Sequence, residues 1–233
     1  MRIDKFLSET GTLTRKESSK AAKTGRITVN GEVVKATDRH IDPEKDVIAL
    51  DGNVIGYKKF VYIIMNKPQG YVSATDDPKE QTVLDLLPEK EQRLGLFPCG
   101  RLDKNTTGLI MLTNDGVLSH KLLAPKTHVE KEYYFEVKFP LSDKDIEELE
   151  KGVDIGGYMT APCKVIRKGQ KSANIILTEG KYHQIKLMLG AVHNQVTLLQ
   201  RVRFDSLVLD TDALPEGKWR YLTDEEEKSL QRN

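Results

Sequence analysis

Apolar and polar positions alternate in two distinct ways in the second part of the chain. Several runs are typical of strands: FVYIIMNKP, which stops at Pro68, GLIMLTNDG, which ends in an Asn-Asp-Gly turn signal, KEYYFEVKF, and SANIILTEG. Two other stretches have helical periodicity. LSDKDIEELEKG begins with a Ser142 cap and ends at Gly152, and KYHQIKLMLGAV places Ile185, Met188 and Val192 on one face. Strands and helices alternate without regular βαβ spacing, so we expect an α+β fold with a mixed, largely antiparallel sheet flanked by helices.

The first 55 residues have a different pattern and predict a small module of two helices and short strands. Thr14 to Glu17 has the Thr-x-x-Glu form of a capping box, and a helix from there is expected to end near Gly25. RITVNGEVVK then contains two short strand-like runs joined by Asn30-Gly31, a strong hairpin signal. DVIALDGNVI carries a similar turn at Asp51-Gly52. Residues 56–60, GYKKF, are the expected linker to a second domain at 61–233.

Basic residues are concentrated at the start of this module. The formal net charge of all 233 residues is only +1, so an attraction to a polyanion has to be local. Lys16, Lys20 and Lys23 share one helix face, and Arg15 and Arg26 flank it. This face is either an ordinary solvated surface or a phosphate-contacting surface, and the density of cations favours the second.

The stretch MRIDKFLSETG…RKESSKAAKTGRITVNGEVV resembles the S4 RNA-binding domain. S4 domains place a pair of helices against structured RNA and occur in ribosomal proteins, RNA-modifying enzymes and ribosome-rescue factors. The resemblance therefore implies RNA as the partner of residues 1–55 and names no reaction.

Several kinds of chemistry lack their usual motifs. The chain has no GxxxxGK[ST] loop, no GxGxxG after a strand, no GxSxG, and no HExxH among its five histidines. Cys99 and Cys163 form no CxxC pair, which favours reduced thiols in a cytoplasmic protein. The N-terminus has charges where a signal peptide is apolar, and no run is long enough to span a bilayer. We expect neither a metal nor a cofactor and no membrane association.

The segment GRLDKNTTGLIMLTNDG, residues 100–116, contains one carboxylate in a turn-rich region. Asp103 could cap the turn, hold a metal, pair with a cation or act as a nucleophile. Thr106, Thr107 and Gly108 suit a tight turn, so these residues by themselves favour the capping role.

Three patches together change that interpretation. NKPQGYVSATDD at 66–77, GRLDKNTTGLIMLTNDG, and KEYYFEV with EGKYHQIKLM resemble the motifs of pseudouridine synthases, in the branch that carries an S4 domain and acts on small-subunit ribosomal RNA. The resemblance implies a cofactor-free isomerisation of uridine in folded RNA. The N1–C1′ bond is cut, the uracil turns, and C5 is joined to C1′. The family aspartate falls on Asp103, which would either add to C1′ or remove the C2′ proton.

The resemblance also assigns roles to other residues. The family cation falls on Lys186, where other branches often have arginine, and it would keep Asp103 ionised in an enclosed site. The family tyrosine falls on Tyr133, whose ring could stack on uracil, whereas Tyr134 would point to the other side of the strand. Arg101 would either occupy the space left by the flipped uridine or hold a phosphate.

Lys67, Lys131 and His183 are further candidates for phosphate or ribose contacts. The expected substrate is 16S ribosomal RNA, either naked or within a partly assembled small subunit, and a monomer satisfies every motif. Three alternatives stay open: a large-subunit enzyme of the same family, a non-catalytic S4-type assembly factor, and a metal-dependent nuclease that uses Asp103, Asp76 and Asp77.

Overall fold

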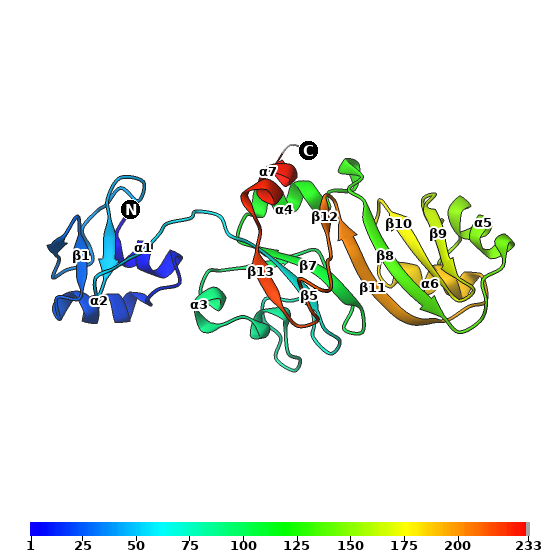
Figure 1. Cartoon of the computed structure of the whole chain (residues 1–233), viewed down its shortest axis with the longest axis horizontal. Helices are drawn as coiled ribbons and strands as arrows, with labels where there is room; N and C mark the ends of the chain where they lie inside the picture. The colour runs from blue at the N-terminus through cyan, green and yellow to red at the C-terminus, as the bar shows by residue number, and fades with distance from the viewer. Residues whose placement is uncertain (232–233) are drawn as a thin grey trace. The chain divides into compact units, whose positions relative to one another are not determined.

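The computed structural model describes residues 1–231, and the chain divides into two compact units (Figure 1). The first unit comprises Met1–Val61 together with Leu84–Phe97. The second comprises Tyr62–Val83 and the chain from Pro98 onward. The segment 84–97 thus groups with the N-terminal module, although its flanking residues on both sides belong to the second unit.

The first unit contains the helices α1 and α2, the single-turn helix α3 and a small antiparallel sheet. Its elements are α1 (Ile3–Glu9), α2 (Arg15–Lys23), β1 (Ile27–Val29), β2 (Glu32–Val33), β3 (Ile48–Leu50), β4 (Asn53–Val54) and the short α3 (Glu89–Gln92), with the 3-10 turn η1 (Val83–Leu86) at its border. The sheet order is β2-β1-β3-β4. Apolar side chains from α1, α2, β1 and β3 form one core, which includes Phe6, Ala22 and Ile27. The predicted arrangement of two helices followed by short strands is confirmed.

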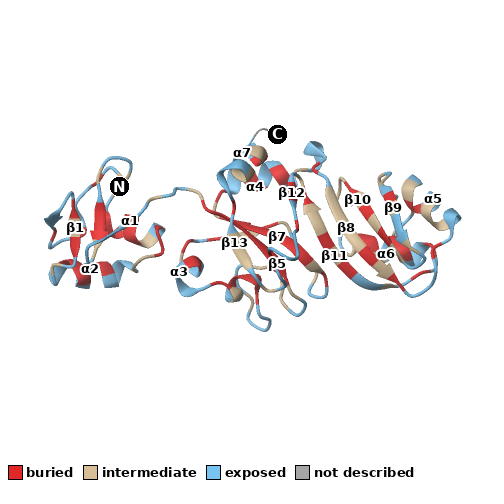
Figure 2. Ribbon diagram, viewed as in Figure 1, coloured by how far each residue is buried: buried red, intermediate tan, exposed pale blue. Residues whose placement is uncertain are grey.

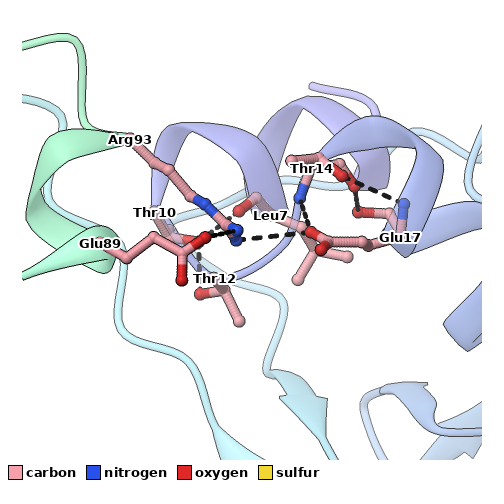
Figure 3. A network of polar contacts seen from close by, with 8 residues as sticks. Leu7, Thr10, Thr12, Thr14, Glu17, Glu89 and Arg93 are labelled. Carbon is pink, nitrogen blue, oxygen red and sulfur yellow. Dashed lines mark hydrogen bonds and ion pairs between the residues drawn. The ribbon is translucent and has the colours of Figure 1, made fainter.

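The start of α2 is capped as the sequence predicts. Thr14 Oγ1 accepts a hydrogen bond from the backbone N–H of Glu17 at 3.2 Å, and the Glu17 carboxylate accepts one from the Thr14 N–H at 2.7 Å. Figure 3 shows this capping box and the neighbouring guanidinium of Arg93, which also ion-pairs with Glu17 and with Glu89. The carboxylate that closes the cap therefore also joins α2 to the 84–97 segment of the same unit.

Both predicted hairpin turns are present. Asn30 and Gly31, between β1 and β2, have φ values of 52° and 84°. Asp51 and Gly52, between β3 and β4, have φ values of 52° and 81°. Two consecutive residues with positive φ match the right-handed twist of the flanking strands, which explains the Asn-Gly and Asp-Gly pairs at these positions.

The second unit is built on a sheet of nine strands. These strands are β5 (Tyr62–Lys67), β6 (Phe97–Cys99), β7 (Thr107–Thr113), β8 (Lys131–Val137), β9 (Lys164–Gly169), β10 (Ser172–Leu177), β11 (Val196–Phe204), β12 (Leu207–Val208) and β13 (Trp219–Tyr221). The order is β13-β5-β7-β11-β8-β10-β9, with β12 beside β11 and β6 beside β7. Strands β7 and β11 pair in parallel, and the other pairs along this order are antiparallel, as predicted for a mixed, largely antiparallel sheet.

Helices lie against this sheet (Figure 1). They are α4 (Gly116–Leu123), α5 (Asp143–Lys151), α6 (Gln184–Ala191) and α7 (Asp224–Gln231), with the 3-10 turn η2 (Pro125–Thr127) after α4. Ile185, Met188 and Leu189 of α6 pack in one core with Phe135 and Ile175 of the sheet, and Figure 2 shows the buried residues there. Within residues 1–231, no helix combines the length and the apolar character that a membrane crossing requires.

One transverse row of the sheet connects the strands around the predicted site. It runs through Lys67 on β5, Gly108 on β7, Arg201 on β11 and Tyr133 on β8. Gly108 has a φ of 101°, and a Cβ added there would lie 2.3 Å from the carbonyl oxygen of Arg201. The parallel contact between β7 and β11 therefore requires glycine, because any side chain would push the two backbones apart.

Gly108→Ala should lower the free energy of unfolding of the second unit by about 3 kcal/mol, because the added methyl meets backbone at a strained φ. Urea unfolding followed by the fluorescence of Trp219, on β13 of the same sheet, would measure this. Gly116→Ala is the matched control. Gly116 is the first residue of α4 and its added Cβ has open space, so this change should be neutral or stabilising by up to about 1 kcal/mol. Equal stability of the two variants would contradict the requirement for glycine at 108.

Candidate functional site

Asp103 and Lys186 meet in the second unit although 83 positions separate them in the sequence. Asp103 lies in the loop between β6 and β7, and Lys186 lies in the first turns of α6. Lys186 Nζ donates to Asp103 Oδ2 at 2.6 Å, and His183 Nε2 lies 3.6 Å from Oδ1. The Asp103 side chain is 28% exposed and that of Lys186 is 31% exposed. The carboxylate is thus accompanied by a cation and is still accessible from solvent.

The Asp103 loop is held from one side by Ser73. Ser73 Oγ donates to the carbonyl oxygen of Leu102 at 2.9 Å and accepts from the Leu102 N–H at 3.0 Å. Both Ser73 and Leu102 are buried. The residue just before the acid therefore has its backbone fixed by a single hydroxyl, which limits where the carboxylate can lie.

Lys67 holds the same loop from within the sheet. Its side chain is fully buried, and Nζ donates to the carbonyl oxygens of Pro68, Lys104 and Thr106 at 3.0, 3.2 and 2.9 Å. Burial lowers the pKa of Lys67 to about 8, and the negative charge of Asp103 opposes that shift. This corrects the sequence-based assignment of Lys67 as an RNA contact, because all three donors of the ammonium point to backbone.

Two other predicted RNA contacts also have partners inside the protein. Lys131 Nζ donates to the carbonyl oxygen of Val129 at 2.9 Å, and burial lowers the pKa of Lys131. The guanidinium of Arg26 makes two hydrogen bonds to the carboxylate of Asp51. Part of the positive charge expected to meet phosphate is therefore already engaged, although Arg26 is still exposed.

The basic face of α2 is exposed, as a contact with phosphate would require. Arg15, Lys16, Lys20 and Lys23 are all exposed in the first unit. In the second unit Arg101 is exposed two residues before Asp103. The structure thus leaves these five cations accessible to a polyanion, whereas Lys67 is excluded from it.

Tyr133 and Tyr134 point to opposite faces of β8. Tyr133 is partly buried against the core formed with α6, the helix that carries Lys186. Tyr134 donates its hydroxyl to Glu136 at 2.8 Å on the other face. In the sheet row, Tyr133 is two strands away from Gly108, which corresponds to roughly 10 Å between their Cα atoms. The strand register therefore places Tyr133, and not Tyr134, on the face of α6.

The start of α6 depends on a polar pair that the sequence analysis missed. Gln184, which is 4% exposed, donates to Glu179 Oε1 at 2.6 Å and accepts from the Lys181 N–H at 2.9 Å. The Glu179 carboxylate also accepts from the Tyr158 hydroxyl and the Ala161 N–H, at 2.7 and 3.0 Å. A signal was available in the sequence: Gln184 lies four residues before the core residue Met188, so a helix places this amide on its buried face.

The acids proposed for a metal-dependent nuclease do not assemble into a metal site. Across residues 1–231, no group of three or more His, Cys, Asp or Glu side chains has an arrangement that could hold a metal ion. Asp77 instead accepts hydrogen bonds from the N–H groups of Lys79 and Glu80 at 2.9 and 3.0 Å. Asp77 thus stabilises a turn, which is the ordinary role of an acid beside proline.

Comparison with known protein families identifies both parts of the chain. Residues 61–191 match the RNA pseudouridylate synthase family and residues 1–48 match the S4 domain. The chain belongs to the RNA pseudouridine synthase family. The match to the synthase model includes Asp103, Tyr133 and Lys186, and the enzyme is therefore an isomerase that acts on RNA.

Relatives of this synthase match it over nearly the whole chain. An uncharacterized RNA pseudouridine synthase of Bacillus subtilis, YtzG, is 46% identical over 97% of this chain and 96% of its own. The ribosomal small subunit pseudouridine synthase A of Escherichia coli K12 is 38% identical over 99% of this chain and 100% of its own. A crystal structure of a pseudouridylate synthase, 34% identical, covers 99% of each chain with a TM-score of 0.69.

Lys67→Met should release the loop of Asp103, because three backbone carbonyls lose their donor. We expect the free energy of unfolding to fall by about 2–4 kcal/mol at pH 7. Lys104→Met is the matched control. Its ammonium pairs with Glu80 at the surface, so the loss should stay below about 1 kcal/mol. An equal effect of both changes would contradict the role of Lys67.

The lowered pKa of Lys67 predicts that the difference in stability between the wild type and Lys67→Met depends on pH. Between about 8 and the ordinary lysine value near 10.4, the unfolded state binds more protons at residue 67 than the folded state does. The stability of the wild type relative to Lys67→Met should therefore rise with pH in this window, with a slope of up to about 1.4 kcal/mol per pH unit. A stability difference that does not change with pH would show that the hydrogen bonds to the three carbonyls offset the effect of burial on the pKa of Lys67.

Proposed function

We propose that this synthase converts one specific uridine of small-subunit (16S) ribosomal RNA to pseudouridine, with Asp103 as the essential acid. The observation that carries this proposal is the contact of Asp103 with Lys186 in a site that solvent can reach. The substrate follows the named activity of the Escherichia coli relative, which aligns along its full length. The exposed cations of α2 supply a surface for the phosphates of folded RNA.

The carboxylate of Asp103 suits the bond that has to break. As uracil leaves C1′, the sugar becomes electron-poor, and an ionised acid can either add to C1′ or remove the C2′ proton. The detached uracil then turns and its C5 bonds to C1′, either as the Asp103–C1′ bond breaks and frees the carboxylate or as the removed proton returns to C2′. C5 loses its proton and N1 gains one, so the overall composition is unchanged. The ammonium of Lys186 lies 2.6 Å from this carboxylate and holds it in place through a charge-assisted hydrogen bond.

Tyr133 and Arg101 have supporting roles in this proposal. The Tyr133 ring, on the α6 face of the sheet, would stack on the uracil, and its hydroxyl would assist removal of the C5 proton. Arg101 would occupy the space that the flipped nucleoside leaves in the RNA. His183 and the α2 cations would contact ribose and phosphates. A monomer bound to RNA within a partly assembled small subunit meets all of these needs.

Asp103→Asn should lower the rate of pseudouridine formation by about 100-fold or more, because an amide neither adds to C1′ nor takes a proton. RNA binding should be largely retained. Reverse-transcription mapping after carbodiimide treatment of small-subunit RNA would detect the product, and a filter-binding assay would measure RNA affinity. Asp76→Asn serves as the control and should leave product formation intact. Normal product from Asp103→Asn would refute the assignment of Asp103 as the essential acid.

Lys186→Met should reduce product formation by about 100-fold or more, because the cation beside the reacting acid is lost. Lys186→Arg should retain activity, since a guanidinium supplies the same charge with two donors. Single-turnover rates on the same RNA would separate this effect from weaker binding. If Lys186→Met and Lys186→Arg lost activity equally, shape at this position would matter more than charge.

A further inference from the structure

Tyr182 is an aromatic residue in an unusual position. It precedes α6, and it is 78% exposed, although a tyrosine ring is normally at least half buried. The ring is nevertheless ordered by a neighbour. It stacks on the imidazole of His183, with 3.8 Å between the ring centroids and 20° between the planes. One face of the tyrosine ring is thus covered and most of the rest of the side chain is open to solvent.

The turn that carries this ring is fixed by the helix behind it. The Gln184 N–H donates to the carbonyl oxygen of Lys181 at 3.2 Å, and the Lys181 N–H donates to Gln184 Oε1 at 2.9 Å. Between them, His183 has a φ of 51°, a left-handed conformation that is uncommon for a residue other than glycine. Such a conformation persists where the surrounding structure holds it.

The imidazole on which this ring stacks lies next to Asp103. His183, on which Tyr182 stacks, has Nε2 only 3.6 Å from Asp103 Oδ1. The His183 imidazole therefore contacts the Tyr182 ring and also lies near the Asp103 carboxylate. Nearby cations suit an RNA strand at this point: Lys186 accompanies Asp103, and the ammonium of Lys181 lies 4.4 Å from the centre of the Tyr158 ring.

When a uridine leaves its RNA stack to reach Asp103, the neighbouring base requires a new stacking partner. When a nucleotide leaves its stack, the base beside it loses a stacking partner. An exposed aromatic ring is the usual protein substitute, because every base has a face that can stack on it. The open face of Tyr182 meets this requirement one ring away from the acid.

We propose that Tyr182, backed by His183, is a stacking platform for the nucleobase adjacent to the target uridine. This inference rests on the proposed function, since it needs RNA in which a uridine is placed at Asp103. The platform binds the RNA strand beside the reacting nucleotide, and it takes no part in bond breaking. Its preference is for an unpaired base of any identity, because stacking does not read hydrogen-bonding edges.

The test compares wild type, Tyr182→Phe and Tyr182→Leu on a transcript of the small-subunit ribosomal RNA from the same organism. Tyr182→Leu should raise KM by about 5- to 150-fold, the range that loss of one base–aromatic stack produces. Tyr182→Phe should behave as the wild type, because the ring and not the hydroxyl is needed. Tyr221→Leu, which removes a 44% exposed tyrosine on β13, is the matched control and should leave KM unchanged.

A second arm separates stacking from a structural effect on His183. Abasic nucleotides are placed on either side of the mapped uridine by ligation of a synthetic segment. For the wild type, one of the two positions should raise KM, and for Tyr182→Leu the same change should have little further effect. If the abasic change and Tyr182→Leu add fully, or if Tyr182→Leu matches the wild type, the platform is refuted while the synthase assignment stands. A wild-type enzyme that leaves small-subunit RNA unmodified would overturn the proposed function and the platform with it.

Discussion

The ion pair between Asp103 and Lys186 is the contact on which the site depends. It joins a loop from the middle of the sheet to a helix 83 positions later, and nothing in the local sequence of either partner compels the meeting. Both side chains are about one-third exposed, so water screens the pair and its contribution to overall stability is small. Its importance lies in holding the Asp103 carboxylate in one place beside a positive charge.

Both sides of that pair are positioned by buried or half-buried polar groups. Ser73 and Lys67 fix the backbone on either side of Asp103, and Glu179 with Gln184 fixes the turn before Lys186. These groups are hydrogen-bonded to defined partners, which limits their motion in a way that apolar packing alone does not. The Asp103 carboxylate is thus held in position by residues whose hydrogen bonds are made within the protein, which is the preorganisation that an electrostatic site requires.

Local features of the fold were predictable because they depend on neighbouring residues. The capping box of α2, the Asn30-Gly31 turn and the helical face of α6 each follow from a few adjacent positions. Strand β11 was not predicted. Its alternation is interrupted by register shifts near both ends, and its central positions carry Gln200 and Arg201.

The site was predictable to a different extent. The resemblance to a family brought Asp103, Lys186 and Tyr133 forward, whereas the residues alone favoured a turn cap. Lys67 was assigned wrongly because its three carbonyl partners come from two loops that the sequence does not show to be adjacent. The sequence alone does not distinguish a surface lysine from a buried one, because burial depends on backbone that is distant along the chain.

The position of β11 has a consequence for synthesis of the protein. This strand, at 196–204, lies between β7 and β8, so β7, which follows the Asp103 loop, and β8, which carries Tyr133, have no common partner until it is made. A nascent chain that has passed residue 137 already holds the carboxylate and the tyrosine, yet the framework that aligns them is incomplete. Contacts between segments so distant along the chain form late. The site is therefore assembled only after most of the polypeptide has left the ribosome, so the protein cannot act on RNA until its synthesis is nearly finished.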